Sequence, residues 1–353
     1  TRSRGVRFGE IETMHETERA IRTAVQAAQK MANVRVDHVI ACFSVAKPRS
    51  YGLTGSVDVQ EGTVRENCVA RVLAACDVPD YGPEREVLHA QPVNFAVDHR
   101  SGLGDPRGQV GQNLSCDMHM LTVDASVVAN LAHCVKRCDL ELAGIANSAY
   151  VSGLAALVED EQELGAACID LGGGSTSISI FMKKHMIYAD AVRMGGDHVT
   201  SDISMGLQVP AATAERIKTF YGGVQATGMA DREMIEINGE TGDWEHDRRQ
   251  VSRAELIGII RPRVEEILEE ARKRLDAAGF EHLPSQKIVL TGGASQMPGL
   301  DGLASRILGQ QVRLGRPIRV HGLPQATTGP GFSSSVGMCL FATRPQDECW
   351  DFD

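Results

Sequence analysis

The spacing of apolar residues predicts helices and strands along the chain. Apolar positions recur at helical spacing over 16–32 and predict an amphipathic helix there. The continuous apolar run at 36–45 predicts a buried strand. A second amphipathic helix should begin with a capping box at Ser252 and end before Gly279. Because Pro262 lies inside this pattern, we expect the helix to kink or to break there.

The pattern changes over residues 46–122. Prolines and glycines separate short strands in this region, and one helical stretch lies around 63–76. A unit of roughly 75 residues is small for a domain, so we expect it to share part of its core with its host. The region is therefore interpreted as a small α+β subdomain inserted into a larger protein.

The segment IDLGGGSTSISIF, residues 169–181, carries the clearest chemical signal. Asp170 precedes three consecutive glycines, after which hydroxyl residues alternate with isoleucines. This pattern predicts a strand, a tight glycine turn and a second strand. Glycines leave backbone N–H groups unshielded for an anion, and a carboxylate just before them is suited to hold Mg²⁺ against phosphates. The segment indicates a phosphate-binding hairpin; the alternative is a plain hairpin with a flexible tip.

Two further features identify no ligand by themselves. A short apolar strand at 287–290 leads into Gly292 and Gly293, which suits close approach to a ligand. Glu215 and Lys218 are three residues apart on a predicted helix, where the ordinary interpretation is a surface ion pair.

Composition excludes several classes of protein. A chain of 353 residues with 42% hydrophobic and 23% charged residues is typical of globular proteins and long enough for two or more domains. The net charge of −10 argues against nucleic acid as a partner. The sequence shows neither a signal peptide nor an apolar run long enough to span a membrane. The nine cysteines form no C-x-x-C pair, which disfavours zinc and fits a reducing cytosol.

Taken together, the two glycine-rich loops resemble a known superfamily. They read IDLGGGST and IVLTGGAS, and they resemble the phosphate and adenosine loops of the actin/Hsp70/hexokinase ATPases. Within that superfamily the chain is most similar to the FtsA family of bacterial cell-division proteins, over essentially its whole length. The segments that carry this likeness are ELG at 163–165, VTSDI at 199–203, AERIK at 214–218, IRPRVEEI at 260–267 and IVLTGGASQMPGL at 288–300.

The resemblance implies an α/β, actin-like fold of two lobes with an FtsA-type inserted subdomain, called 1C. It also implies how the chain divides among subdomains. These are 1–44, 123–156 and 316–353 for subdomain 1A, 45–122 for 1C, 157–190 and 260–315 for 2A, and 191–259 for 2B.

The same resemblance implies ATP and Mg²⁺ as ligands. Asp170 would be the catalytic candidate and would hold Mg²⁺ through its bound water. Glu215 and Lys218 would reach the ribose or adenine, and Ala294 would help to close the adenine slot. The glycines and hydroxyl residues implied to lie against the nucleotide are Gly172, Gly173, Gly174, Ser175, Thr176, Gly195, Gly196, Gly292 and Gly293.

The resemblance further implies a cytoplasmic polymer at the inner face of the bacterial cell membrane, at the division site. Its partners would be other copies of itself, the C-terminal tail of the tubulin-like protein FtsZ and later divisome proteins. Arg263 is a candidate contact for the acidic FtsZ tail, since an arginine on a charged helix suits an acidic peptide.

Some features depart from the family pattern. The family's first phosphate hairpin would precede Thr1, and its basic membrane-binding helix would follow the acidic end of this chain, so we expect a partial chain. Ser177 stands where an aspartate is common in the family. The helix before the hairpin offers no glutamine or glutamate to orient the attacking water, and Asn147 and Ser148 are its nearest polar residues. We therefore expect slow hydrolysis at most, and weak ATP binding by this piece alone. The alternatives are an actin-like protein of type IV pilus assembly and a sugar kinase of the same superfamily.

Overall fold

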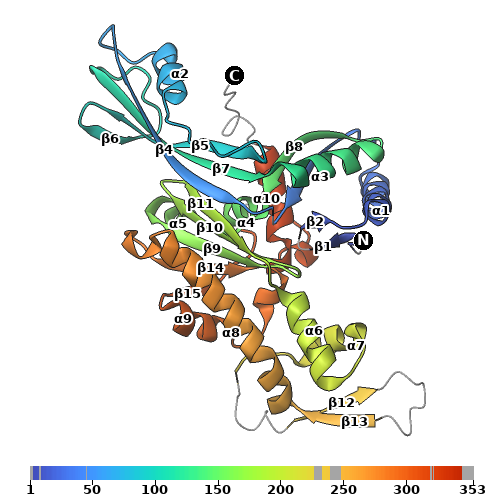
Figure 1. Ribbon diagram of the computed structural model, residues 1–353. Coiled ribbons are helices and arrows are strands. Elements are labelled where there is room, and N and C mark those ends of the chain that lie inside the picture. The colour runs from blue at the N-terminus through green and yellow to red at the C-terminus, as the bar shows by residue number, and fades with distance from the viewer. Residues whose placement is uncertain are drawn as a thin grey trace.

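A mixed five-stranded sheet, an antiparallel four-stranded sheet, a parallel pair of strands and the helices between them make up most of the described structure. The computed structural model describes residues 3–7, 9–44, 46–225, 233–238, 248–318, 320 and 322–343. The four-stranded sheet lies at one end, the five-stranded sheet lies in the middle, and α6, α7 and the β12–β13 hairpin lie at the other end (Figure 1).

The five-stranded sheet has the order β11-β10-β9-β14-β15. Its strands β9, β10 and β11 are antiparallel neighbours, whereas β14 runs parallel to both β9 and β15. Residues of β9 pack alternately on two cores: Ile169 lies among the residues of α8 and α9, and Cys168 lies against α4. The bounds are Ala166–Leu171 (β9), Thr176–Met182 (β10), His185–Val192 (β11), Lys287–Thr291 (β14) and Val312–Leu314 (β15). The predicted hairpin and the strand at 287–290 are confirmed.

Helices cover both faces of this sheet. The helices on the α8 side are α8 (Arg253–Ala277) and α9 (Leu300–Leu308), and those on the opposite side are α4 (Ser148–Ala156) and α10 (Ser333–Ala342). The helix α5 (Glu159–Leu164) joins α4 to the sheet. Glycines allow α4 and α10 to pack tightly: a Cβ on Gly337 would collide with the backbone of Val151, and a Cβ on Gly153 would collide with the ring of Phe181.

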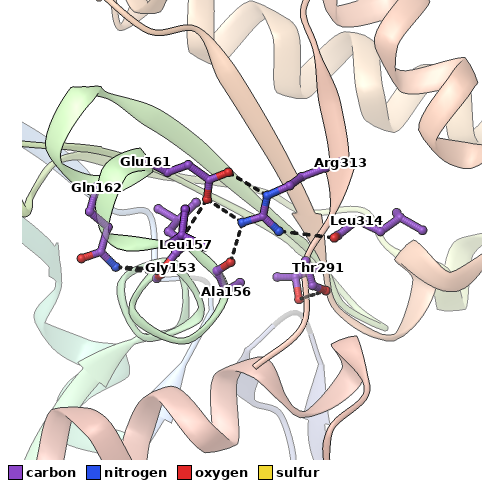
Figure 2. A network of polar contacts seen from close by, with 10 residues as sticks. Gly153, Ala156, Leu157, Glu161, Gln162, Thr291, Arg313 and Leu314 are labelled. Carbon is purple, nitrogen blue, oxygen red and sulfur yellow. Dashed lines mark hydrogen bonds and ion pairs between the residues drawn. The ribbon is translucent and has the colours of Figure 1, made fainter. Parts of the chain in front are cut away.

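An ion pair fastens α5 and the end of α4 to β15 (Figure 2). The Arg313 Nε atom lies 2.7 Å from Glu161 Oε1, and a terminal nitrogen of Arg313 donates to the Ala156 carbonyl at 2.9 Å. Burial by itself would raise the pKa of Glu161, but the hydrogen bonds from Arg313 and from the Val158 N–H outweigh burial and lower that pKa. The carboxylate is thus charged and fully matched by groups of its own chain.

A two-stranded parallel sheet of β3 and β8 lies beside α1 and α3. The sequence predicts β3 and α1 close to where they are found. It gives no sign of the short hairpin β1–β2 that precedes α1. The bounds are Val6–Arg7 (β1), Glu10–Ile11 (β2), Met14–Ala32 (α1), His38–Phe43 (β3), Ala125–Arg137 (α3) and Glu141–Asn147 (β8).

The inserted region forms the four-stranded sheet, in the order β4-β7-β5-β6, with α2 on one face. Residues of β7 divide between two cores, because Met118 and Met120 face α2 while Leu121 packs with Tyr150 of α4. The Ser50 hydroxyl also bridges to the backbone of Ala189 in β11. The expectation of a core shared with the host is confirmed. The bounds are Arg49–Asp58 (β4), Glu66–Ala74 (α2), Arg85–Val97 (β5), Arg100–Leu103 (β6) and Asn113–Asp124 (β7).

The remaining elements correct one local expectation. Pro262 does not break α8, which runs as one helix from the Ser252 cap to Ala277. Gly195 occupies the cap position of α6. The loop at 239–247 and the acidic end at 344–353 lie outside the described residues. The bounds are Gly196–Leu207 (α6), Ala211–Tyr221 (α7), Met234–Asn238 (β12) and Arg248–Ser252 (β13).

Candidate nucleotide site

The glycine turn between β9 and β10 presents unpaired backbone donors. The Gly172 N–H donates to the Ser175 carbonyl at 3.0 Å and closes the turn. The N–H groups of Gly173, Gly174 and Ser175 hydrogen bond to no residue in the described part of the chain. Three successive free N–H groups in a tight turn are a concave anion site. The turn therefore has the geometry expected of a phosphate loop.

A cavity of about 890 Å³ opens over this turn. One wall consists of residues 172–175 together with Asp197 and Ser201 at the start of α6. The rest of the lining comes from the β1–β2 hairpin and the residues around it, from α1, from Phe43 at the end of β3 and from Val127 in α3. The cavity thus lies between the five-stranded sheet and the two-stranded sheet, where a ligand would contact both.

The start of α6 is bonded directly to the glycine turn. The Gly196 N–H donates to the Gly172 carbonyl at 2.9 Å, and the Asp197 N–H donates to the Gly173 carbonyl at 2.8 Å. No side chain fits at Gly195, whose Cβ would lie 2.6 Å from the Gly172 carbonyl oxygen and closer still to that of Gly173. The glycines at 195 and 196 therefore allow α6 to approach the turn closely.

Asp170 lies beneath the turn on the α4 and α10 side of the sheet. Its residue is only 8% exposed. The Ser152 hydroxyl of α4 donates to its Oδ2 atom, and the Ser334 hydroxyl of α10 donates to the same atom at 2.8 Å. Burial raises the pKa of Asp170, and the two hydroxyl bonds only partly offset this. The Oδ1 atom accepts no hydrogen bond from any described residue. The carboxylate is thus oriented but carries no matching positive charge.

Glu215 and Lys218 belong to a network in which Lys218 is mostly buried and the Glu215 side chain is 52% exposed. The Lys218 side chain is 13% exposed, and its Nζ atom lies 2.7 Å from Glu215 Oε2. The ammonium group also donates to the Gly196 carbonyl at 3.0 Å and to the Thr200 hydroxyl at 2.8 Å. Burial would raise the pKa of Glu215, but the hydrogen bonds from Lys218 and Thr200 lower it. This network ties α7 to the start of α6, next to the glycine turn.

The second glycine loop reaches the same place. Gly292 has a φ of +89°, and a Cβ on it would collide with Asp170 Oδ1. A Cβ on Gly196 would lie 3.2 Å from the Cβ of Ala294. Gly293, by contrast, has open space around its Cα. The structure therefore brings together the residues from 170–176, 195–196, 215–218 and 292–294 that the sequence associates with one ligand.

Arg263 lies apart from this group and is already paired. Its guanidinium makes two bonds to the Asp202 carboxylate of α6, at 2.7 Å and 3.1 Å, and one to Glu266. Its pKa is raised, chiefly by the bonds to Asp202. The fork between Arg263 and Asp202 fastens α8 to α6.

Sequence reasoning missed the two serines that hold Asp170. Ser152 lies in a helix that the sequence marks only as rich in small residues, and Ser334 is the second of three consecutive serines at 333–335. The run of serines at a helix start is the one signal that could have drawn attention to this end of the site.

The donor set around Asp170 fits Mg²⁺. No cluster of three His, Cys, Asp or Glu side chains with metal-binding geometry occurs in the described ranges. Mg²⁺ commonly keeps several waters and takes one or two carboxylates plus substrate phosphates, and does not need a cage of protein ligands. A single oriented carboxylate beside three free N–H groups matches that requirement, and bound Mg²⁺ would supply charge neutralisation of the phosphates.

Comparison with solved structures identifies the class of protein. The PilM–PilN type IV pilus biogenesis complex matches with a TM-score of 0.62 at 16% identity, over 96% of this chain and 88% of that chain. MreB5 of Spiroplasma citri bound to ADP matches with a TM-score of 0.56 at 14% identity, over 97% of this chain and 78% of that one. At such low identity these likenesses show the fold alone. The chain has the actin-like ATPase fold.

Sequence comparison identifies the family. A family model described as cell division protein FtsA matches residues 167–337, and one described as the SHS2 domain inserted in FtsA matches 46–122. "Cell division protein FtsA" of Agrobacterium fabrum is 41% identical over 96% of this chain and 77% of its own length. The protein of the same name from Pseudomonas aeruginosa is 32% identical over 98% of this chain and 82% of its own. The chain belongs to the FtsA family of cell-division proteins. None of the helices in the described ranges is both long and apolar enough to cross a membrane.

Proposed function

We propose that this chain is the nucleotide-binding body of a cell-division protein that binds ATP with Mg²⁺. The observation that carries this proposal is the row of three unpaired N–H groups at 173–175, which face a cavity of about 890 Å³ beside an oriented carboxylate. The phosphates would take the free N–H groups and the Ser175 hydroxyl. The Thr176 hydroxyl donates to the Met194 carbonyl at 2.8 Å and its residue is fully buried, so a phosphate contact would require it to leave that partner. Asp170 would hold Mg²⁺ through its bound water, with Oδ1 as the available acceptor.

The adenosine would lie between the second glycine loop and the network of α7. Gly292 lies against Asp170, Ala294 lies near Gly196, and Gly293 has open space around its Cα. Lys218 lies between Gly196 and Glu215, where it orients the Glu215 carboxylate toward the start of α6. These polar groups would hydrogen bond to the ribose or to the base edge. Because they are already ordered before a ligand arrives, binding would not require the entropy cost of ordering them.

We infer that the nucleotide acts mainly as a switch and is hydrolysed slowly at most. The oxygens of both polar side chains at the start of α4 already have intramolecular partners, whereas the buried Asn147 amide nitrogen has none among the described residues. The Asn147 oxygen accepts from the Ala149 N–H at 2.9 Å, and the Ser148 hydroxyl lies 2.6 Å from that of Ser177. A general base must reach the water it activates, and neither group is an efficient base.

The proposed cellular role rests on membership of the family. The whole protein would polymerise at the inner face of the membrane, link the FtsZ ring to that membrane and recruit later divisome proteins. We also propose that the chain divides into the four subdomains that the resemblance implies. Arg263 remains a proposed contact for the FtsZ tail, with the condition that an acidic peptide must share or displace the Asp202 pairing.

Titration of ATP into the natural protein, with and without Mg²⁺, tests the nucleotide proposal. We expect saturable binding that Mg²⁺ strengthens and that inorganic phosphate at high concentration weakens. ATP binding that phosphate leaves unchanged would argue against the glycine turn as its site.

Binding to an FtsZ tail peptide tests the partner proposal. We expect Arg263→Glu to reduce capture of the peptide at least tenfold, in line with loss of a charge-assisted contact. Arg261→Glu is the matched control, since Arg261 forms an ion pair with Glu265 on its own helix and with no other described residue. Equal loss with both variants, or capture that survives Arg263→Glu, would remove Arg263 from the site.

A further inference from the structure

We propose that Ser152 and Ser334 are positioning residues that fix Asp170 for Mg²⁺ and couple it to the packing of α4 against α10. This inference rests on the proposed nucleotide function of Asp170 and adds two residues that the glycine loops do not include. Both hydroxyls contact the same carboxylate atom, Oδ2, and they lie 2.8 Å from each other. The two serines and the carboxylate therefore form a closed triangle.

The triangle has three contacts but only two hydroxyl protons. If both serines donate to Asp170, their mutual contact has no proton. If one serine donates to the other, the second still donates to Asp170. The carboxylate therefore receives at least one hydrogen bond in every arrangement that uses two contacts. A hydrogen bond to a buried charge is worth more than one between neutral groups, so the arrangement with two bonds to Asp170 is favoured.

The triangle of Ser152, Ser334 and Asp170, called the serine bracket from here on, determines which carboxylate oxygen is available to a ligand. With Oδ2 occupied by the hydroxyls, Oδ1 is the atom free to accept from a metal-bound water. Oδ1 lies against Gly292, where any side chain would collide with it. The serines and the glycine thus fix the carboxylate from two sides, and a preorganised ligand binds without the entropy cost of ordering it.

The bracket also joins parts of the protein that come from distant positions in the chain. Ser152 and Ser334 lie 182 positions apart, on two helices that pack closely at Gly337. The helix α4 continues directly from β8 of the two-stranded sheet, whereas Asp170 belongs to β9 of the five-stranded sheet. A nearby hydroxyl pair, Thr291 and Ser333 at 2.6 Å, bonds the start of α10 to β14. Mg²⁺ held through Asp170 would therefore be coupled to α4 and α10, the helices between the two sheets.

The test measures ATP affinity of the natural protein with Mg²⁺ and with EDTA, and takes the ratio as the readout. We expect Ser152→Ala and Ser334→Ala to lower the ratio less than about threefold each, since the remaining hydroxyl still serves Asp170. The double variant should lower it about tenfold or more, which exceeds the product of the singles. Affinity in EDTA should stay within about twofold.

Ser179→Ala is the matched control. Ser179 is a buried serine whose hydroxyl donates to the backbone of α4 at 2.8 Å, yet it does not contact Asp170. It should leave the ratio unchanged even if it lowers thermal stability. If the double variant does not fold, Ser152→Cys with Ser334→Ala replaces it, because a thiol fills the space but is a weak donor.

The outcomes separate the two proposals. A wild-type protein whose ATP affinity ignores Mg²⁺ contradicts the proposed function. A wild-type protein that responds to Mg²⁺, together with a double variant that keeps the full ratio, overturns the positioning role alone. Equal losses with and without Mg²⁺ would assign the serines to packing only, and that result also overturns it.

Discussion

Two buried carboxylates lie against the same helix, α4, and they are held in opposite ways. Glu161 is 6% exposed and Asp170 is 8% exposed. Glu161 accepts hydrogen bonds from the Arg313 guanidinium and from the Val158 N–H, and these balance its charge within the chain. Asp170 receives two neutral hydroxyls, from Ser152 and Ser334. Arg313 balances the charge of Glu161, and we call this the complete site. Asp170 is oriented by two hydroxyls but pairs with no described cation, and we call this the incomplete site.

The pKa directions express this difference. Burial raises the pKa of Asp170, because hydroxyl bonds only partly replace water around the charge. Burial acts on Glu161 too, but the bonds from Arg313 outweigh it and lower that pKa. A buried carboxylate matched by its own chain is structural. A buried carboxylate with oriented neutral donors and one free oxygen is prepared for a cation that arrives with a ligand.

The largest expected effect comes from removing the cation of the complete site. Arg313→Met should lower the free energy of unfolding by about 2–3 kcal/mol, because Glu161 would stay buried without its partner. The Arg313 side chain is 37% exposed, so water can reach the site and the loss should fall below that of a fully buried pair. Urea denaturation measures it. Glu161→Gln combined with Arg313→Met should recover part of the loss; a double variant as unstable as Arg313→Met would contradict the pairing argument.

Removing the charge of Asp170 should stabilise the ligand-free protein but weaken ATP binding. Asp170→Asn keeps an oxygen for the serine hydroxyls but removes the charge, so the ligand-free protein should gain up to about 1 kcal/mol in unfolding free energy. The Mg²⁺-dependent part of ATP affinity should fall by about 2 kcal/mol, roughly thirtyfold. Thermal denaturation and calorimetric titration measure the two effects. A variant that is destabilised and still responds to Mg²⁺ would make Asp170 a structural residue like Glu161.

The glycines near Asp170 extend the comparison, because the incomplete site must leave room for a ligand and the complete site does not. Gly195→Ala should cost about 1–2 kcal/mol in stability and weaken ATP binding, because its Cβ would collide with two backbone carbonyls. Gly293→Ala is the matched change, with open space around it, and should leave the ligand-free protein unaffected. A loss of ATP affinity without loss of stability in Gly293→Ala would support its place in the adenine slot, whereas unchanged affinity would remove it.

The sequence predicts the incomplete site better than the complete one. Asp170 and the three glycines are consecutive, so a local pattern reveals both the turn and its chemistry. The loop at 292–294 is recognisable for the same reason, and the resemblance between the pair and known ATPases brings them together. Their actual contact, through Gly292 and Asp170, depends on β9 and β14 lying parallel, which no local pattern shows.

The complete site is invisible in the sequence for a physical reason. Glu161 and Arg313 lie 152 positions apart, and each is an ordinary charged residue in its own segment. The serine bracket spans 182 positions and uses a residue type common in loops and helix starts. Pro262 shows the converse error, since a local rule predicts a break that the packing of Ile260 and Val264 into the core overrides.

The smallest expected effect is a difference in pH dependence between the two carboxylates. The lowered pKa of Glu161 means that its contribution is fully present above the unfolded value of about 4.5 and is lost as pH falls through its folded pKa. The stability advantage of the wild type over Glu161→Gln should therefore shrink as pH falls below about 4.5. The raised pKa of Asp170 has the opposite sign: its buried charge is a cost at neutral pH that disappears as pH falls through its folded pKa. The wild type should therefore gain on Asp170→Asn as pH falls toward the unfolded value of about 3.8, whereas it loses its advantage over Glu161→Gln as pH falls below about 4.5. Urea midpoints from pH 7 down to the acid limit of folding measure both trends, and two differences that move in the same direction would show that the sites are not distinct in charge balance.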